Sequence, residues 1–96
     1  MEESEIYKQA RESWGDPLQR LMVIEECAEL IQSICKYFRG LETNDDILKE
    51  AVDVQLMVNQ IRSMVDNEEL WASHTKYKLD RIEKRLDETD ASRNKD

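Results

Sequence analysis

The sequence predicts an all-α protein, a bundle of the four-helix type that associates with further copies of itself. The first reason is composition, because the 96 residues include only two glycines and one proline, the residues that most often interrupt helices. The second is periodicity, because apolar residues recur three and four positions apart along most of the chain. The third is size: a chain this short buries a modest core, which favours a dimer or a larger assembly.

Two helices are predicted in the first part of the chain. The first covers residues 3–13, and the second begins at Asp16-Pro17, because an aspartate cap followed by proline is a typical helix start. This second helix runs to Arg39, where Gly40 can adopt the left-handed conformation that ends a helix. The apolar residues at helical spacing in the first segment are Ile6, Tyr7, Ala10 and Trp14.

Two further helices are predicted after this point. Thr43 or Asn44 caps the third, which runs to about Val65. The fourth is expected over residues 67–87, because residues 66–69 resemble a capping box. It carries a heptad-like apolar stripe that would pack against a neighbour. The stripe consists of Thr75, Leu79, Ile82 and Leu86.

Length, composition and net charge narrow the classes to which this protein can belong. We expect one domain over residues 1–87 and a disordered polar tail over 88–96. The net charge is −8, from 22 acidic and 14 basic residues, which argues against binding to nucleic acid or to an anionic membrane. No apolar run reaches the roughly 20 residues that span a bilayer, and no signal peptide opens the chain. Cys27 and Cys35 lie too far apart on one helix to form a disulfide, so we expect core thiols in a cytoplasmic protein.

Acidic residues interrupt the two most apolar predicted helices. Glu25, Glu26 and Glu29 lie in the second helix, and Glu50 and Asp53 lie in the third. Residues three positions apart project side by side from a helix. If the two helices pack antiparallel, as a short connector favours, two carboxylate pairs face each other across one cleft.

Four converging carboxylates repel one another unless a cation lies between them. Oxygen ligands select a hard ion, so Mg²⁺ is the first choice and Mn²⁺ the second. Taken singly, each acidic pair is more typical of a solvated helix face, but two pairs inside two apolar helices favour a metal site. A di-iron bundle would need two Glu-x-x-His motifs. The single histidine, His74, lies on another helix, which excludes that alternative.

Two short motifs resemble a known enzyme family. "EECAE" (25–29) followed by "EAVD" (50–53) is similar to the EExxE and ExxD motifs of MazG-like nucleotide pyrophosphohydrolases, which belong to the all-α NTP pyrophosphatases. The resemblance covers roughly residues 14–65. It implies hydrolysis of a nucleoside triphosphate to a monophosphate and pyrophosphate, with Mg²⁺ held by acids of the two motifs, and it suggests a role in nucleotide-pool housekeeping. The apolar surface of the second and third predicted helices cannot all be covered within so short a chain, which predicts a homodimer or a homotetramer.

The resemblance also implies a role for each acid. Carried over by position, the metal ligands would be Glu26, Glu29, Glu50 and Asp53. Glu25 would orient or deprotonate the attacking water, or would hold a further metal that arrives with the substrate.

Four other residues are candidates for substrate binding. Lys36 and Arg39 follow Glu29 along the same helix and could contact the outer phosphates, although cations at a helix end also complement its dipole. Gln60 lies close to the direction of Asp53 on its helix, at a position where many MazG-like proteins carry asparagine. Trp14, like Tyr37, is a candidate surface for stacking a nucleobase, unless it packs in the core or at an interface.

Two alternatives remain open. The chain could be an enzyme of the same fold that acts on another pyrophosphate ester, such as phosphoribosyl-ATP. It could instead be a non-catalytic helical interaction module, whose apolar stripes bind a partner and whose acids provide solubility. Mg²⁺-dependent release of pyrophosphate separates the enzymes from the module.

Overall fold

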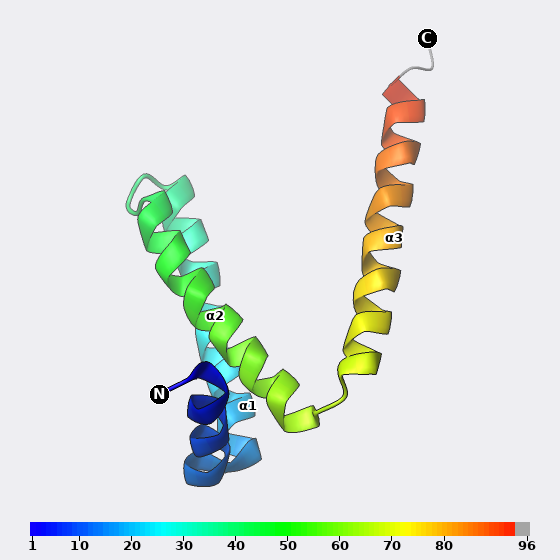
Figure 1. The fold of residues 1–96 in the computed structure, drawn as a ribbon. Helices are drawn as coiled ribbons and strands as arrows, with labels where there is room; N and C mark the ends of the chain where they lie inside the picture. Colours follow the sequence, from blue (N-terminus) through cyan, green and yellow to red (C-terminus); the bar gives the residue numbers. More distant parts are fainter. Residues whose placement is uncertain (94–96) are drawn as a thin grey trace. The chain divides into compact units, whose positions relative to one another are not determined.

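The computed structural model describes residues 1–93, and three helices account for nearly all of them (Figure 1). They are α1 (Glu3–Phe38), α2 (Asn44–Val65) and α3 (Glu68–Arg93). No strand occurs within this range, and the all-α class is confirmed. No helix of the described part has the length and apolar content that a bilayer crossing requires.

The chain divides into two compact units. The first unit is Met1–Asp66 and holds α1 and α2, whereas the second begins at Asn67 and holds α3. This boundary lies inside the single domain expected over residues 1–87. Because α3 has no second helix within its own unit, its apolar residues are not buried there.

A bend at Gly15 joins the two helices that the sequence predicts before Gly40. Gly15 has φ 76° and ψ 165°, a conformation that glycine adopts far more easily than any other residue. The bend divides α1 into an N-terminal arm (residues 3–14) and a C-terminal arm (residues 16–38). The Gln19 side-chain amide donates a hydrogen bond to the Gly15 carbonyl at 3.3 Å, which supports the first turn after the bend.

The C-terminal arm ends in a Schellman motif. Gly40 has φ 75°, and its amide donates to the Tyr37 carbonyl at 3.0 Å, while the Leu41 amide donates to the Lys36 carbonyl at 2.9 Å. These bonds satisfy carbonyls that the helix end leaves free. The helix ends at Phe38, one residue before the predicted end, and Gly40 acts as the sequence indicates.

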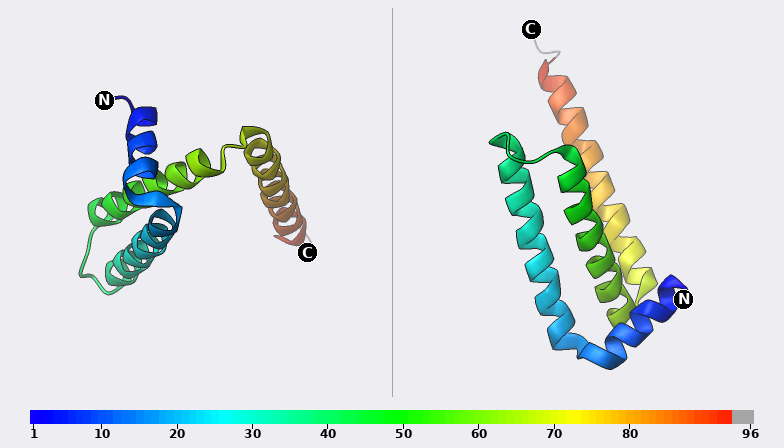
Figure 2. Two further views of the ribbon diagram at one scale, coloured as in Figure 1. Left: turned by 90° about the horizontal axis from the view of Figure 1, so that it is seen from below. Right: turned by 90° about the vertical axis from the view of Figure 1, so that its left-hand side faces the viewer.

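A short connector returns the chain so that α2 runs antiparallel to the C-terminal arm (Figure 2). Thr43 caps α2 in a capping box, because its side chain accepts from the Asp46 amide and the Asp46 side chain accepts from the Thr43 amide at 2.8 Å. Between the two alternatives considered for the cap, Thr43 rather than Asn44 takes the role.

The N-terminal arm is tied to the second half of α2 by side chains. The Arg11 guanidinium donates to the Ser63 hydroxyl, and the Asn59 amide donates to the Tyr7 hydroxyl at 3.2 Å. The core of this unit is small. Its buried side chains are Ala10, Gln19, Ser33, Met57 and Gln60.

An apolar stripe on the C-terminal arm remains exposed. Its residues recur at spacings of three and seven, and they are between 56 and 80% exposed. They are Leu21, Ile24, Ile31 and Phe38. Exposed apolar stripes of this kind are typical of interfaces, so association of copies of this chain stays a prediction with a candidate surface.

The start and end of α3 differ from the prediction. The Asn67 side chain caps the start of α3, because its Oδ1 accepts a hydrogen bond from the Leu70 amide at 3.0 Å. Asp66, with φ 51°, is instead the left-handed residue that ends α2. The capping box expected over 66–69 is therefore wrong. The helix also continues to Arg93, so the predicted tail of 88–96 is helical over 88–93, and 94–96 lie outside the described residues.

The expected burial of the cysteines is correct in part. Cys27 is half-buried, whereas Cys35 is exposed. Cys35 lies on the outer side of the C-terminal arm, seven residues after Ala28 and four after the exposed Ile31. The sequence pattern of an apolar helix does not distinguish a face that packs on α2 from one that α2 leaves open.

Gly15→Ala should destabilise the first unit. A side chain at φ 76° is strained even though no atom lies close enough to clash with it, and such conformations cost of the order of 1–3 kcal/mol for other residues. We expect a lower Tm in thermal unfolding monitored by circular dichroism. Glu12→Ala, exposed on the preceding turn, is the control, and an equal Tm for the two variants would contradict the bend.

Candidate metal centre

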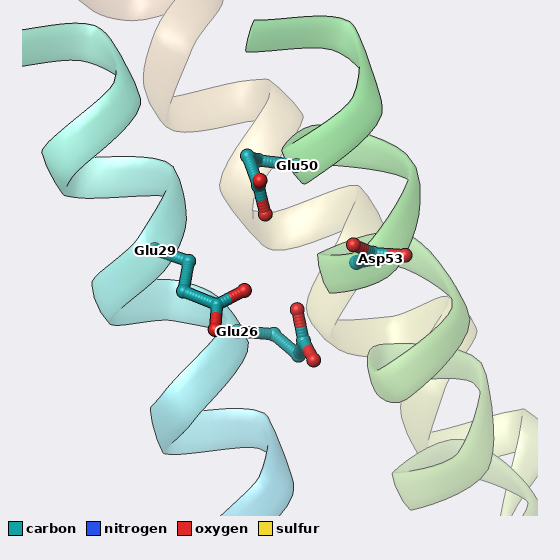
Figure 3. A group of neighbouring side chains, drawn as sticks. All are labelled: Glu26, Glu29, Glu50 and Asp53. Atoms are coloured by element: carbon teal, nitrogen blue, oxygen red, sulfur yellow. The ribbon is translucent and has the colours of Figure 1, made fainter. Parts of the chain in front are cut away.

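Four carboxylates converge between α1 and α2 (Figure 3). Glu26 and Glu29 project from the C-terminal arm of α1, and Glu50 and Asp53 project from α2. One oxygen of each residue lies within 4.8 Å of the chosen oxygens of the other three. Each pair has the three-residue spacing that places two side chains on one helix face, and the antiparallel packing brings the two faces together.

Two of the four side chains are partly removed from solvent. Glu26 and Glu50 are half-buried, and Oε2 of each is buried without a hydrogen-bond partner. Glu29 and Asp53 are exposed. A buried polar atom without a partner is destabilising. The cluster therefore has an open side that faces solvent and an inner side where two oxygens lack a donor.

The surroundings make the inner carboxylates harder to ionise. Burial raises the pKa of Glu26, and the nearby negative charges of Glu29 and Asp53 raise it further. Burial likewise raises the pKa of Glu50, followed by the charges of the same two neighbours. Both causes act against the charged form. Glu26 and Glu50 are therefore both harder to ionise than an isolated glutamate, for the same two reasons.

The ion pairs of Lys8, Arg20, Lys36, Lys49 and Lys76 are all formed with carboxylates outside the cluster. A divalent cation between the carboxylates would reverse the repulsion and would give the buried oxygens a partner. The donors are all carboxylate oxygens, which suits a hard cation rather than a soft one.

The predicted phosphate-binding residues lie near one end of the cluster. Lys36 Nζ is 3.6 Å from Oε1 of Glu42, and the Ser33 hydroxyl donates to Oε2 of Glu42 at 2.5 Å. Arg39 is exposed and forms the C-cap of α1. Glu42 thus holds Lys36 beside the connector. The sequence gives no sign of this contact, because Glu42 lies in a segment without helical periodicity.

The other two substrate candidates share a pocket. Trp14, half exposed, and Gln60, 8% exposed, both line a cavity of about 380 Å³ between the N-terminal arm and α2. The remaining lining residues are Met1, Ile6, Gln9, Ala10 and Ser13. Oε1 of Gln60 is buried without a hydrogen-bond partner. Except for Trp14 and Gln60, the sequence gives no sign of this pocket, because it depends on how the bend places the arm.

Glu25 is not part of the cluster. It is exposed on α1 next to Glu26, and the group of four converging acids does not include it. Its predicted role in catalysis stays a prediction. A consecutive residue points about 100° away around a helix, which explains why Glu25 and Glu26 cannot both face α2.

Raising the pH should destabilise the metal-free protein through this cluster. Because the pKa values of Glu26 and Glu50 are raised on folding, the folded state keeps its protons longer than the unfolded state. The resulting penalty is absent below the ordinary glutamate pKa of about 4.3 and grows as pH rises through the raised values. In EDTA, the double variant Glu26→Gln, Glu50→Gln should match or exceed the parent in Tm at neutral pH. This difference in Tm between variant and parent should shrink toward pH 4.3. A difference that does not change with pH would contradict the raised pKa values of Glu26 and Glu50.

Asp53→Asn should separate the effects of charge and metal. In EDTA the variant should be at least as stable as the parent, because one repelling charge is gone. With Mg²⁺ the order should reverse, since a ligand that binds the folded state at a hundred times its Kd stabilises it by about 2.7 kcal/mol. Asp87→Asn, exposed on α3, is the control. Melting curves with an equal Mg²⁺ shift for parent and Asp53→Asn would exclude Asp53 as a ligand.

Comparisons of this chain with models of known families, with curated proteins and with solved structures found no match. The resemblance to MazG-like enzymes therefore depends on the two acidic motifs, and the roles carried over from it stay predictions. The convergence of the four carboxylates is a separate observation. It comes from the packing of α1 on α2 and does not depend on the resemblance.

Proposed function

We propose that this protein is a Mg²⁺-dependent nucleoside triphosphate pyrophosphohydrolase of the MazG-like type. The observation that supports the proposal is the convergence of Glu26, Glu29, Glu50 and Asp53 from two motifs onto one site. The buried oxygens without partners add to it, because they are atoms that a cation would satisfy. We further propose that the enzyme acts in the cytoplasm as a homodimer or homotetramer.

The four carboxylates would hold the metal. Glu26 and Glu50 offer inner oxygens, and Glu29 and Asp53 offer oxygens on the side open to solvent. Mg²⁺, with Mn²⁺ as the second choice, supplies charge neutralisation and polarisation of a phosphoryl group when it is bound. Because four carboxylates outweigh one divalent ion, the site retains negative charge. It therefore favours a triphosphate that already carries its own Mg²⁺ over a bare one.

Water is the second substrate. Conversion of a triphosphate to a monophosphate and pyrophosphate breaks the anhydride bond between the α- and β-phosphates, and water supplies the hydroxyl group and a proton. Glu25 is exposed and lies next to Glu26 in the sequence, and the resemblance gives it the role of orienting this water and accepting its proton.

The substrate would extend along the antiparallel helices. Gln60 lies two turns beyond Asp53 on α2, and Lys36 lies two turns beyond Glu29 on α1, each about 10 Å along the helix axis. Because the helices are antiparallel, these positions are at opposite ends of the cluster. The pocket at Trp14 and Gln60 would take the nucleobase, and the triphosphate would lie over the carboxylates.

Lys36 and Arg39 would then contact the outer phosphates. Lys36 is engaged by Glu42 at 3.6 Å, so a phosphate would compete with that carboxylate. The pair is partly exposed, and exposed ion pairs are weak, about 0–1 kcal/mol. A phosphate bearing more charge than one carboxylate can therefore displace Glu42.

The proposal predicts Mg²⁺-dependent release of pyrophosphate from at least one nucleoside triphosphate, with no orthophosphate as first product. A panel of canonical and modified triphosphates, read by product chromatography, is the measurement. EDTA should abolish turnover and excess Mg²⁺ should restore it. Asp53→Asn should reduce turnover to near background, whereas the double variant Cys27→Ala, Cys35→Ser should retain most of it.

The same assay separates the alternatives. Release of pyrophosphate from phosphoribosyl-ATP but from no simple triphosphate would indicate the enzyme of the same fold that acts on another pyrophosphate ester. No pyrophosphate from any substrate with Mg²⁺ or Mn²⁺, in a protein whose melting curve shows it is folded, would exclude the enzyme and favour the interaction module.

A further inference from the structure

Helix α3 carries an apolar seam with a seven-residue repeat. No glycine or proline interrupts the helix. Leu79, Ile82 and Leu86 lie on the seam and are 59, 52 and 58% exposed. In heptad notation, position a holds Ala72, Leu79 and Leu86, and position d holds Thr75, Ile82 and Thr89. A single helix cannot bury its own stripe, so a seam of this kind requires a neighbouring element.

Two hollows flank the beginning of this seam. One, of about 320 Å³, passes between Thr75, Leu79 and the side chains of His74 and Lys78. The other, of about 470 Å³, passes on the other side of Thr75 and Leu79, next to Ala72. Spaces on both sides of a seam residue are the holes that side chains of a facing helix fill in a coiled coil.

The charges beside the seam indicate which helix fits. Lys78 and Arg85 occupy position g, and Glu83 and Asp90 occupy position e. In a parallel pair of helices, a residue at g faces the residue five positions later, at e, on the other helix. A second copy of α3 would therefore bring Lys78 to Glu83 and Arg85 to Asp90, and symmetry would form each contact twice.

We propose that α3 binds α3 of a second copy of this chain in a parallel, in-register, two-stranded coiled coil. The antiparallel arrangement is disfavoured, because it brings g to g and e to e. With Ile82 opposite Leu86, Arg85 and Glu83 would each face their own equivalents. With Ile82 opposite Leu79, Lys78 would face Arg85. The attraction that either register offers comes from Lys76, to Asp90 or to Glu83, and it competes with the bond that Lys76 already forms to Asp80 at 2.9 Å in its own helix.

Two strands fit this seam better than three or four. From Lys76 to Asp90 every residue at e and g is charged, which confines the apolar stripe to positions a and d there, and larger bundles bury more of e and g. Leucine at a with isoleucine at d is a pattern of larger bundles, but a single isoleucine, Ile82, occupies d, between two threonines. The narrow stripe therefore decides in favour of the pair.

Disulfide trapping in the full chain tests the proposal. In a background with Cys27→Ala and Cys35→Ser, we would introduce Thr75→Cys or Thr89→Cys, because facing d positions of a parallel pair lie within reach of a disulfide. Mild oxidation at low micromolar concentration should convert each variant almost completely to a covalent dimer. Lys84→Cys, on the outer side of the helix, is the matched control and should stay almost entirely uncrosslinked.

Mixing the two cysteine variants tests the direction. In a parallel pair, Thr75→Cys and Thr89→Cys chains link only to chains of their own kind, as mass spectrometry would show. In an antiparallel pair, position d faces position a, so neither cysteine would meet its own equivalent. Thr75→Cys linking to Leu86→Cys, or Thr89→Cys linking to Leu79→Cys, would overturn the proposal. Crosslinking no greater than that of Lys84→Cys would overturn it as well, whatever the mass of the protein in solution.

A charge exchange tests the contacts beside the seam. With Thr75→Cys present, Lys78→Glu with Arg85→Glu should greatly reduce trapping, because both g positions would then face acids. Glu83→Lys with Asp90→Lys should do the same through like positive charges. A mixture of the two variants should restore trapping, now between unlike chains. If trapping by either variant alone equals that of the parent, the assigned positions e and g are wrong.

Discussion

The short turn between α1 and α2 sets the register on which the rest of the first unit depends. The Schellman motif at Gly40 and the capping box at Thr43 stop one helix and start the next within a few residues. Glu29 and Glu50 lie at similar distances from this turn along the chain, as do Glu26 and Asp53. An antiparallel return of fixed length therefore places the two acidic pairs opposite each other.

This register brings four carboxylates together that repel one another. The turn and the contacts between the helices must therefore offset that repulsion. The buried core is small for that task, with Ala10 and Met57 as its buried apolar side chains. Folding therefore works against the charges of Glu26, Glu29, Glu50 and Asp53 rather than through them. An arrangement that is unfavourable for stability by itself is typical of sites selected for binding.

The sequence predicts those parts of the fold that local chemistry determines. Gly40 and Thr43 need particular backbone conformations or hydrogen bonds, and the acids of the cluster follow from helical spacing once the two helices are antiparallel. The sequence does not distinguish Asp66 from Asn67 as the residue that starts α3, because either side chain can cap a helix. It also misses the helix over 88–93, where composition is polar but no residue stops the helix.

Features that depend on packing are harder to predict from the sequence. Cys35 lies in an apolar helix and is exposed, because α2 covers only one face of it. The pocket at Trp14 and Gln60 joins residues from distant parts of the chain, and its shape depends on the bend at Gly15. No local pattern contains the direction in which the N-terminal arm leaves that bend.

The N-terminal arm is joined to the rest of α1 at a single non-helical residue, Gly15, and a rotation of the arm would take place about that residue. An arm of residues 3–14 is about 18 Å long, so a rotation of about 6° at Gly15 moves its far end by roughly 2 Å. Glycine offers little resistance to such a rotation. The arm is instead held by Arg11 on Ser63 and by Tyr7 on Asn59, one and two turns before the pocket residue Trp14. Asn59 also donates to the Glu3 carboxylate at 3.3 Å, so three polar contacts along the arm, rather than the torsion angles at Gly15, hold it against α2 beside the pocket.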